Sequence, residues 1–223
     1  WLVGEEHQGL KIMFHMMNEA RIGTGAQGVA LANSAYQYAL AYAKERVHGS
    51  SIENFKDPAA PRVAITRHPD VRRMLMTMKV QSETMRSMLY RLGHRHDVAH
   101  HDESKKDKYM GRVDLLVPVL KAHCTDIGFD VTVTGVQVLG GYGYTQEYPM
   151  EQLVRDAKIA SVYEGTNGIQ AMDLLARKLR QKGGALLMDW IQDSTKLCTE
   201  SMEDFPTEAG ALAKAIQHVG ATA

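Results

Sequence analysis

One stretch of the chain keeps helical spacing for some seven turns, and it constrains the fold more than any other. Apolar or small residues recur there at steps of three and four, at Val113, Leu116, Leu120, Cys124, Ile127, Val131, Thr134 and Val138. Pro118 lies within the stretch and is expected to kink the helix mildly. The run Gly140-Gly141-Tyr142-Gly143-Tyr144 follows and is expected to end it. So long a helix must bury one face against other elements, which favours a helical fold.

The rest of the chain also favours helices, because only 6 prolines interrupt its 223 residues. The patterns predict helices from Gly9 to Asn18, from Gly28 to Arg46, from Pro69 to Leu92, in a short segment after Pro149, and from Thr166 to about Gln181. The stripe expected to face the core comprises Leu10, Met13, Phe14 and Met17 in the first of these helices. In the helix that begins at Pro69 it comprises Val71, Leu75, Met78, Ser82, Met85, Leu89 and Leu92. No segment shows convincing strand alternation, and the best strand candidate, residues 159–163, is short. The prediction is an all-α fold, an antiparallel up-down four-helix bundle.

A second, weaker helical part is predicted at the C-terminal end. Gly183-Gly184 is a candidate hinge, and residues 185–223 suggest one or two amphipathic helices with Pro206 between them. We therefore divide the chain into a bundle domain at residues 1–182 and the start of a helical C-terminal extension at residues 183–223.

Two polar segments are predicted to be loops. Residues 50–68 contain two of the prolines and precede Pro69. Residues 93–108 carry His94, His96, His100 and His101 among many charged residues, and we expect them to be exposed and mobile. The spacing of these histidines is poor for a tetrahedral metal site, so no metal is predicted.

Charge and composition argue against several classes of protein. The 26 Lys and Arg residues balance 26 Asp and Glu residues, whereas a nucleic-acid-binding domain normally has a basic excess. No apolar run approaches the length of a membrane span, and no signal peptide is visible. Two cysteines without a CxxC motif favour a reducing compartment, so we expect a cytoplasmic protein. Because the chain begins with Trp1, we expect it to be a piece of a longer protein.

The segment Gly23-Thr24-Gly25-Ala26-Gln27-Gly28 matches the G-x-G-x-x-G pattern of dinucleotide-binding loops. That motif requires a strand before it and a βαβ unit around it. The preceding residues are predicted to be helical, and no second strand follows. We therefore interpret these small residues as a surface for close helix packing.

Residues 136–170 are the most informative for function. Gln137 and Gly140-Gly141 end a long helix with backbone that a ligand can approach closely, and Arg155-Asp156 places a charge pair on a short element. Tyr163-Glu164-Gly165-Thr166 places a carboxylate just before a helix N-terminus, whose free N–H groups can bind a polar ligand. Alternatively, Glu164 simply interacts with the positive end of the helix dipole, and the residues alone leave both readings open.

This stretch closely resembles the C-terminal domain of acyl-CoA dehydrogenases. The matching segments are QVLGGYGY, EYPMEQLVRDAKI and YEGTNGIQ, preceded by GEEHQGLKIMF, NEAR and AKERVHG, so the resemblance covers about residues 1–181. HPDVRRMLMTMK and the tail after Gly183 are most similar to larger bacterial members with a C-terminal extension, including those acting on 3-methylmercaptopropionyl-CoA. The resemblance implies that the family's N-terminal and β-domains are absent from this chain.

The resemblance also implies roles for individual residues. Glu164 is the expected catalytic base, and Arg21 and Gly165 are expected near the substrate. The expected FAD contacts are Arg46, Gln137, Gly140, Gly141, Thr166 and Asn167. Among them, Gln137, Gly140 and Gly141 are expected to contact FAD from the neighbouring subunit. Some subfamilies place the base at a position that is Ala20 in this chain. Glu19 is one residue away and points about 100° round the helix, so it is not expected to replace that base. Glu164 is therefore expected to be the sole base. The chain departs from the family pattern at His48, His68-Pro69 and Gly168.

The activity implied by the resemblance is α,β-desaturation of acyl-CoA thioesters in fatty acid beta-oxidation. Hydride would pass to FAD, and electrons would then pass to an electron-transfer flavoprotein. We expect a homo-oligomer, and we expect the isolated chain to lack FAD and activity. Two alternatives remain open: a catalytically retired homologue that binds DNA or a partner, and a bundle that only mediates oligomerisation.

Overall fold

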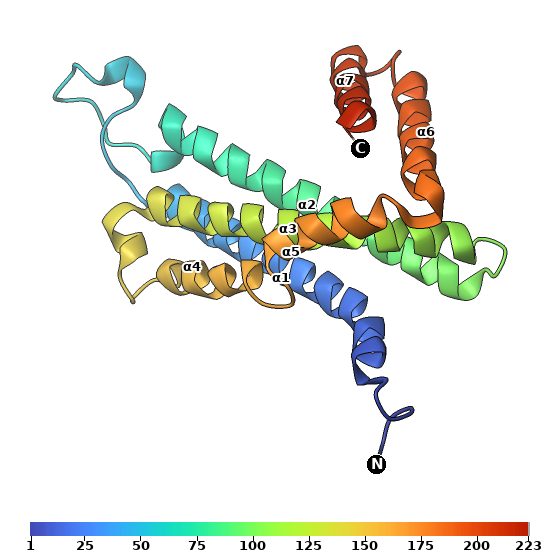
Figure 1. The fold of residues 1–223 in the computed structure, drawn as a ribbon. Helices are drawn as coiled ribbons and strands as arrows, with labels where there is room; N and C mark the ends of the chain where they lie inside the picture. Colours follow the sequence, from blue (N-terminus) through green and yellow to red (C-terminus); the bar gives the residue numbers. More distant parts are fainter. Residues whose placement is uncertain (223) are drawn as a thin grey trace. The chain divides into compact units, whose positions relative to one another are not determined.

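The chain folds into helices joined by short connections (Figure 1). The computed structural model describes residues 1–222, apart from the side chains of Lys11, Phe14 and His15, so the predicted core role of Phe14 lies outside the described residues. The α-helices are α1 (Gly9–Glu45), α2 (Pro69–His101), α3 (Lys106–Leu139), α4 (Met150–Lys158), α5 (Asn167–Met172), α6 (Ala185–Glu200) and α7 (Pro206–Thr222). Within residues 1–222 no strand forms, which confirms the predicted all-α class.

Shorter helical turns connect these elements. The 3-10 turns are Ile52–Asn54, Ile65–Arg67, Gly140–Tyr144, Ile159–Ser161 and Gln181–Gly184, and a π-helix covers Asp173–Lys178. The turn at Gly140–Tyr144 ends α3 where the sequence predicted a stop. The predicted strand candidate at residues 159–163 is instead a 3-10 turn and the bend after it.

The chain divides into two compact units. The first comprises Trp1–Arg91 and Leu120–Asn167, and the second comprises Leu92–Val119 and Gly168–Ala223. The long helices α2 and α3 therefore contribute to both units. The predicted domain boundary at residues 182 and 183 stays a prediction.

The first unit is a four-helix bundle of α1, α4, the part of α2 up to Arg91 and the part of α3 from Leu120, which lie side by side (Figure 1). The predicted stripe of α2 faces its interior, where Met78 and Met85 are fully buried. Gly135 of α3 lies against Met78 and against Met150 of α4, so a side chain at this position would collide with α4. Three helices thus meet closely at one glycine in the core.

Glycines also bring α1 and α3 into contact within the first unit. A Cβ atom at Gly28 would clash with the backbone of Cys124, and one at Gly128 would lie 2.7 Å from the carbonyl oxygen of Gly28. The G-x-G-x-x-G segment lies inside α1, which runs for 37 residues instead of forming the two separate helices predicted. The packing interpretation is confirmed for Gly25 and Gly28, which lie against α3, whereas a Cβ atom at Gly23 would meet nothing within 4 Å.

The predicted loop at residues 93–108 is wrong, because α2 continues to His101 and α3 begins at Lys106. Ala99 is 2% exposed and extends the buried stripe of α2 past Leu92, while His94 and His101 are exposed on the same helix. The polar composition of an exposed helix face resembled that of a loop. Among the described residues, no group of three or more possible metal ligands is placed to hold an ion.

In the second unit, α6 and α7 pack against each other and α6 also meets the start of α3. A Cβ atom at Gly111 would lie 2.5 Å from the side chain of Leu186. The candidate hinge is a left-handed turn, with φ of 50° at Lys182, 66° at Gly183 and 86° at Gly184. Pro206 occupies the first position of α7, where its missing N–H is tolerated.

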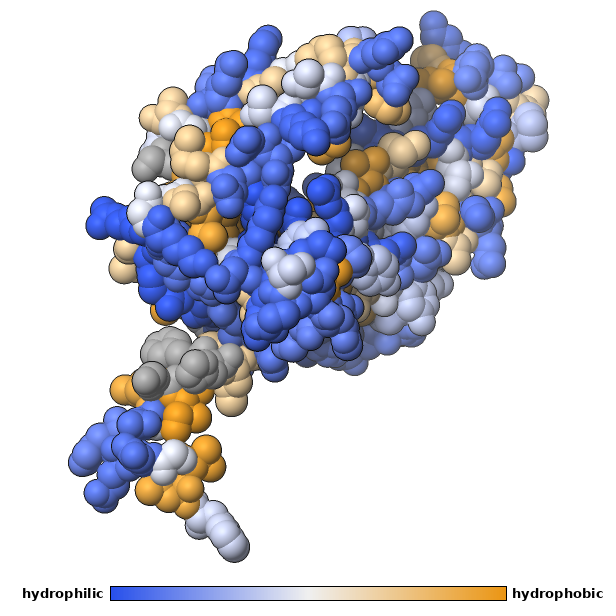
Figure 2. Space-filling view, turned by 90° about the vertical axis from the view of Figure 1, so that its right-hand side faces the viewer, coloured by the Kyte–Doolittle hydropathy of each residue, from blue (hydrophilic) through white to orange (hydrophobic). Residues whose placement is uncertain are grey.

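Apolar side chains remain exposed at both ends of the chain. Figure 2 shows them on the N-terminal segment and the start of α1, where Leu2, Val3 and Leu10 are each 70% exposed or more. Met188 of α6 and Phe205 before α7 are also exposed. No helix within residues 1–222 is long and apolar enough to cross a membrane.

Candidate active site

The proposed catalytic carboxylate lies in a tight turn between the 3-10 turn at Ile159–Ser161 and α5. Glu164 and Gly165 both have left-handed backbones, with φ of 56° and 84°. This conformation is easy for glycine but strained for glutamate, so the rest of the structure must hold it. Glu164 is half-buried, and Thr166 directly precedes the first residue of α5.

Side chains from α1 and α3 hold this turn on its two sides. The hydroxyl of Tyr163 donates a hydrogen bond to Oε1 of Gln27 on α1. Nζ of Lys121 on α3 donates to the carbonyl oxygen of Gly165 at 2.8 Å and to Oδ1 of Asn167 at 2.9 Å. The turn is therefore fixed immediately before and immediately after Glu164.

Asn167 connects the start of α5 to α3 through both ends of its amide. Its oxygen accepts from Lys121, and its Nδ2 donates to Oδ1 of Asp126 at 2.7 Å and to Oγ1 of Thr125 at 3.0 Å. The side chain is thus fully committed to contacts inside the protein. A contact between Asn167 and a ligand would have to use its backbone.

The surroundings of Lys121 are strongly charged. Lys121 is fully buried, and this burial lowers its pKa; Asp126 opposes that effect, Arg21 adds to it, and Glu164 opposes it. Arg21 is only 5% exposed on α1. Arg21, Glu164 and Gly165 therefore all lie around Lys121, and their predicted roles stay predictions.

The other predicted ligand contacts gather at the far end of α3. Arg46 follows α1, and its guanidinium lies over the ring of Tyr142, 5.3 Å from the centroid. Tyr142 belongs to the turn that contains Gly140 and Gly141, and a Cβ atom at either glycine would meet nothing within 4 Å. Gln137 is exposed less than one turn earlier. A cation and an open backbone thus lie beside each other at this end of α3.

The loop after Arg46 is anchored by its backbone. Ile65 N–H donates to the Arg46 carbonyl at 2.8 Å, and His48 N–H donates to the Val63 carbonyl at 3.0 Å. Nε2 of His68 donates to the carbonyl of His48 at 2.7 Å. The ring of His68 and the backbone of His48 therefore bind each other and hold the loop beside Arg46.

The predicted FAD residues form two groups along α3. Lys121 contacts the Glu164 turn, whereas Gly140 follows the last residue of the helix. Their separation of about 19 residues corresponds to roughly 28 Å of helix. Thr166 and Asn167 thus lie far from Arg46, Gln137, Gly140 and Gly141, an arrangement expected of a long ligand or of a ligand shared between subunits.

Comparisons with known proteins decide the family. The model of the acyl-CoA dehydrogenase C-terminal domain matches residues 7–179. This chain belongs to the acyl-CoA dehydrogenase family. It is 43% identical over 185 residues to 3-methylmercaptopropionyl-CoA dehydrogenase of Ruegeria pomeroyi, a match that covers 82% of this chain and 31% of that enzyme. The chain therefore spans about a third of the length of this curated relative.

Two solved structures share the fold of this chain. Butyryl-CoA dehydrogenase from Megasphaera elsdenii superposes with a TM-score of 0.63 at 30% identity, over 79% of this chain and 40% of that one. ACDH-11 of Caenorhabditis elegans gives a TM-score of 0.83 at 18% identity, over 98% of this chain and 35% of that one. The second match shows the fold alone, but it includes the helices after residue 182.

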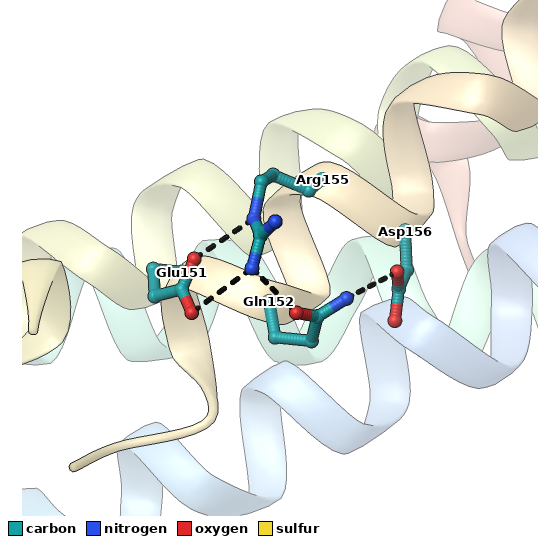
Figure 3. Close-up of polar contacts among 4 residues, drawn as sticks. All are labelled: Glu151, Gln152, Arg155 and Asp156. Atoms are coloured by element: carbon teal, nitrogen blue, oxygen red, sulfur yellow. Dashed lines mark hydrogen bonds and ion pairs between the residues drawn. The ribbon is translucent and has the colours of Figure 1, made fainter. Parts of the chain in front are cut away.

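The two residues of the charge pair predicted on α4 of this acyl-CoA dehydrogenase domain bind other residues of the same helix. Arg155 instead binds Glu151, with Nε 2.9 Å from Oε2, and Gln152 donates to Asp156 at 2.6 Å (Figure 3). Each bond joins neighbours one turn apart on an exposed face. These contacts are ordinary helix-surface pairs.

Lys121, Gln27 and Asp126 were missed by the motif argument, although they contact the candidate site. A signal for Lys121 exists in the sequence, because this lysine directly follows Leu120 and lies about one turn before Cys124, two positions of the α3 stripe. A cation on the buried side of an acyl-CoA dehydrogenase helix needs partners. Which partners it finds depends on the fold.

Proposed function

We propose that the full-length protein carrying this chain is an FAD-dependent acyl-CoA dehydrogenase that introduces an α,β double bond into acyl-CoA thioesters. The observation that carries this proposal is the Glu164 turn, which is held in a left-handed conformation between α1 and α3. Membership of the family supports it. The balanced charge of the chain argues against a DNA-binding alternative.

Glu164 would accept the α-proton of the thioester. The α-carbon is weakly acidic, so a carboxylate must be held within hydrogen-bonding reach of that proton. The two tethers of the turn limit the positions that the carboxylate can take. Gly165 has no side chain to obstruct a thioester lying against the turn, and the Gly165 and Thr166 backbone lines the same path.

The residues present fit FAD. Arg46 offers an exposed guanidinium beside the open backbone of Gly140 and Gly141, a combination suited to a pyrophosphate. Gln137 adds an amide on the same surface, and the Thr166 and Asn167 backbone would meet the cofactor at the other group. Bound FAD would supply the hydride acceptor for the β-hydrogen.

Glu164→Gln in the full-length enzyme tests the proposal. The amide keeps the shape of the side chain but cannot accept a proton, so turnover should fall about a hundredfold or more while FAD and acyl-CoA binding persist. Glu83→Gln, on the exposed face of α2, is the matched control and should keep wild-type turnover. Turnover of Glu164→Gln within a few-fold of wild type would place the base elsewhere.

The partners and the location are part of the same proposal. We propose an electron-transfer flavoprotein as electron acceptor and a homo-oligomer in the bacterial cytoplasm. The exposed apolar side chains on α1 and α6 support self-association. Steady-state reduction of a purified electron-transfer flavoprotein, and light scattering of the full-length protein, would test the two statements separately.

A further inference from the structure

We propose that Lys121 is a positioning residue that sets the direction of the Glu164 carboxylate by fixing the turn behind it. The proposal rests on the proposed role of Glu164 as the base. The ammonium of Lys121 donates hydrogen bonds to the Gly165 carbonyl and to the side chain of Asn167. Its action would pass through Gly165 and Asn167.

The burial of Lys121 is the first argument. The residue is fully buried on α3, where the helix otherwise packs Val117, Leu120 and Cys124 into the core. A buried ammonium is unfavourable unless hydrogen bonds replace its hydration, and a methionine would fill the same space without that penalty. A lysine here is therefore better explained by what its ammonium binds than by packing.

The choice of acceptors is the second argument. Nζ donates to the carbonyl of Gly165 at 2.8 Å and to Oδ1 of Asn167 at 2.9 Å, which lie just after the base. Asn167 is held in turn by Asp126 and Thr125 of the same helix. The ammonium thus ties the turn and the start of α5 to one rigid element.

The backbone of the turn is the third argument. Glu164 has a φ of 56°, which a non-glycine residue keeps only when its surroundings impose it. Tyr163 is tethered to Gln27 on one side, so Lys121 supplies the restraint on the other. Without Lys121 the Gly165 carbonyl loses this hydrogen bond, and the strained turn that carries Glu164 can shift. Proton transfer is sensitive to displacements of about 1 Å, so turnover should respond.

Lys121→Met in the full-length enzyme is the direct test. Methionine fills a similar volume without donors, so FAD content should persist and KM for acyl-CoA should stay within about threefold, while kcat falls roughly 10- to 100-fold. Lys105→Met is the matched control, because Lys105 is an exposed lysine between α2 and α3. Wild-type kcat in Lys121→Met would overturn the proposal.

A double-mutant cycle separates this proposal from the proposed function. If Lys121 acts through Glu164, adding Lys121→Met to Glu164→Gln should cause no further loss of turnover. A further loss as large as that in the wild-type background would overturn the positioning role. Full activity of Glu164→Gln alone would instead refute the proposed base, whatever Lys121→Met does.

Asn167→Ala provides a second route if Lys121→Met fails to retain FAD. It removes one acceptor of the Lys121 ammonium and leaves the Gly165 bond intact, so a smaller loss of kcat is expected, about three- to tenfold. That loss should also vanish in the Glu164→Gln background. Unchanged kcat in Asn167→Ala, or a loss that persists in that background, would overturn the proposal.

Discussion

Two of the lysines whose side chains the structure describes are almost completely buried, one in each compact unit, and their partners differ. Lys121 in the first unit gives its ammonium to a backbone carbonyl and a side-chain amide. Lys178 in the second unit is 1% exposed and pairs with the carboxylate of Asp114. Burial lowers the pKa of both groups, and for Lys178 the bond to Asp114 is the strongest opposing influence.

The difference separates a structural charge from a functional one. When an ammonium pairs with a carboxylate, their attraction offsets the free-energy cost of burying the charge. The pair also joins two helices, here the π-helical segment Asp173–Lys178 and α3. An ammonium bound to neutral acceptors in a strained turn is a less favourable arrangement, and its benefit lies in the geometry that it imposes. Stability should therefore depend on the Lys178–Asp114 pair. Turnover should depend on the hydrogen bonds from Lys121 to Gly165 and Asn167.

The largest effect on stability is expected from Asp114→Asn. Removing the carboxylate leaves Lys178 as a buried charge without its counter-ion, which should lower the free energy of unfolding by about 3 kcal/mol. Glu103→Gln, which breaks the exposed pair with Lys106, should change it by less than about 0.5 kcal/mol. Urea unfolding of the full-length protein would measure both.

Turnover per folded molecule should stay at the wild-type level in Asp114→Asn. A substantial loss of turnover in the folded fraction would show that the pair in the second unit also shapes the site. The contrast between the two lysines would then be wrong.

A smaller effect on stability is expected from Gly28→Ala, at the contact that sets the spacing of α1 and α3. The added Cβ would clash with the backbone of Cys124, so the two helices must move apart at a cost of about 2 kcal/mol. Gly23→Ala is the matched control in the same motif, because nothing lies within 4 Å of its Cβ position. Alanine there should stabilise the helix by about 0.5–1 kcal/mol.

The same pair of variants tests the packing interpretation of the motif. If Gly23-Thr24-Gly25-Ala26-Gln27-Gly28 held a nucleotide, both substitutions would reduce the FAD content. Thermal unfolding and the flavin absorbance of each purified variant answer the question together. We expect Gly23→Ala to retain FAD at the wild-type ratio.

The smallest effect is expected for alkylation of Cys124, which lies at this α1–α3 contact. Burial raises the pKa of its thiol to about 12. The thiolate is the reactive form, so at pH 8 only roughly one molecule in ten thousand would carry it. Iodoacetamide should therefore leave the Cys124 peptide unmodified in the native protein and label it in urea, as measured by mass spectrometry.

Labelling of Cys124 also reports on the spacing of the helices. The rate should rise in Gly28→Ala, where α1 and α3 are pushed apart, and stay unchanged in Asp114→Asn, which alters the second unit. Rapid labelling of Cys124 in the wild-type protein would contradict a tightly closed first unit.

Helix assignments succeeded where apolar residues recurred with helical spacing. The stripe of α2 predicted from Leu75, Met78 and Met85 is buried, and the glycine-rich run at 140–144 ends α3 as expected. The segment at 93–108 was misassigned because an exposed helix face and a loop share the same polar composition. Periodicity reports which face is buried, and a helix with a nearly all-polar segment gives little of that signal.

The sequence by itself determined the family, the helical class and the identity of the residues expected in the site, since these depend on local periodicity and on short motifs such as Tyr163-Glu164-Gly165-Thr166. Only the tertiary structure showed that Lys121 reaches Gly165 and Asn167, about 44 and 46 residues further along the chain. It also separated the predicted FAD residues into two groups. Such contacts depend on the packing of α1 against α3 and on the turn that precedes α5. A sequence pattern with a period of three or four residues reports only which side of one helix is buried, so it cannot predict contacts between distant segments.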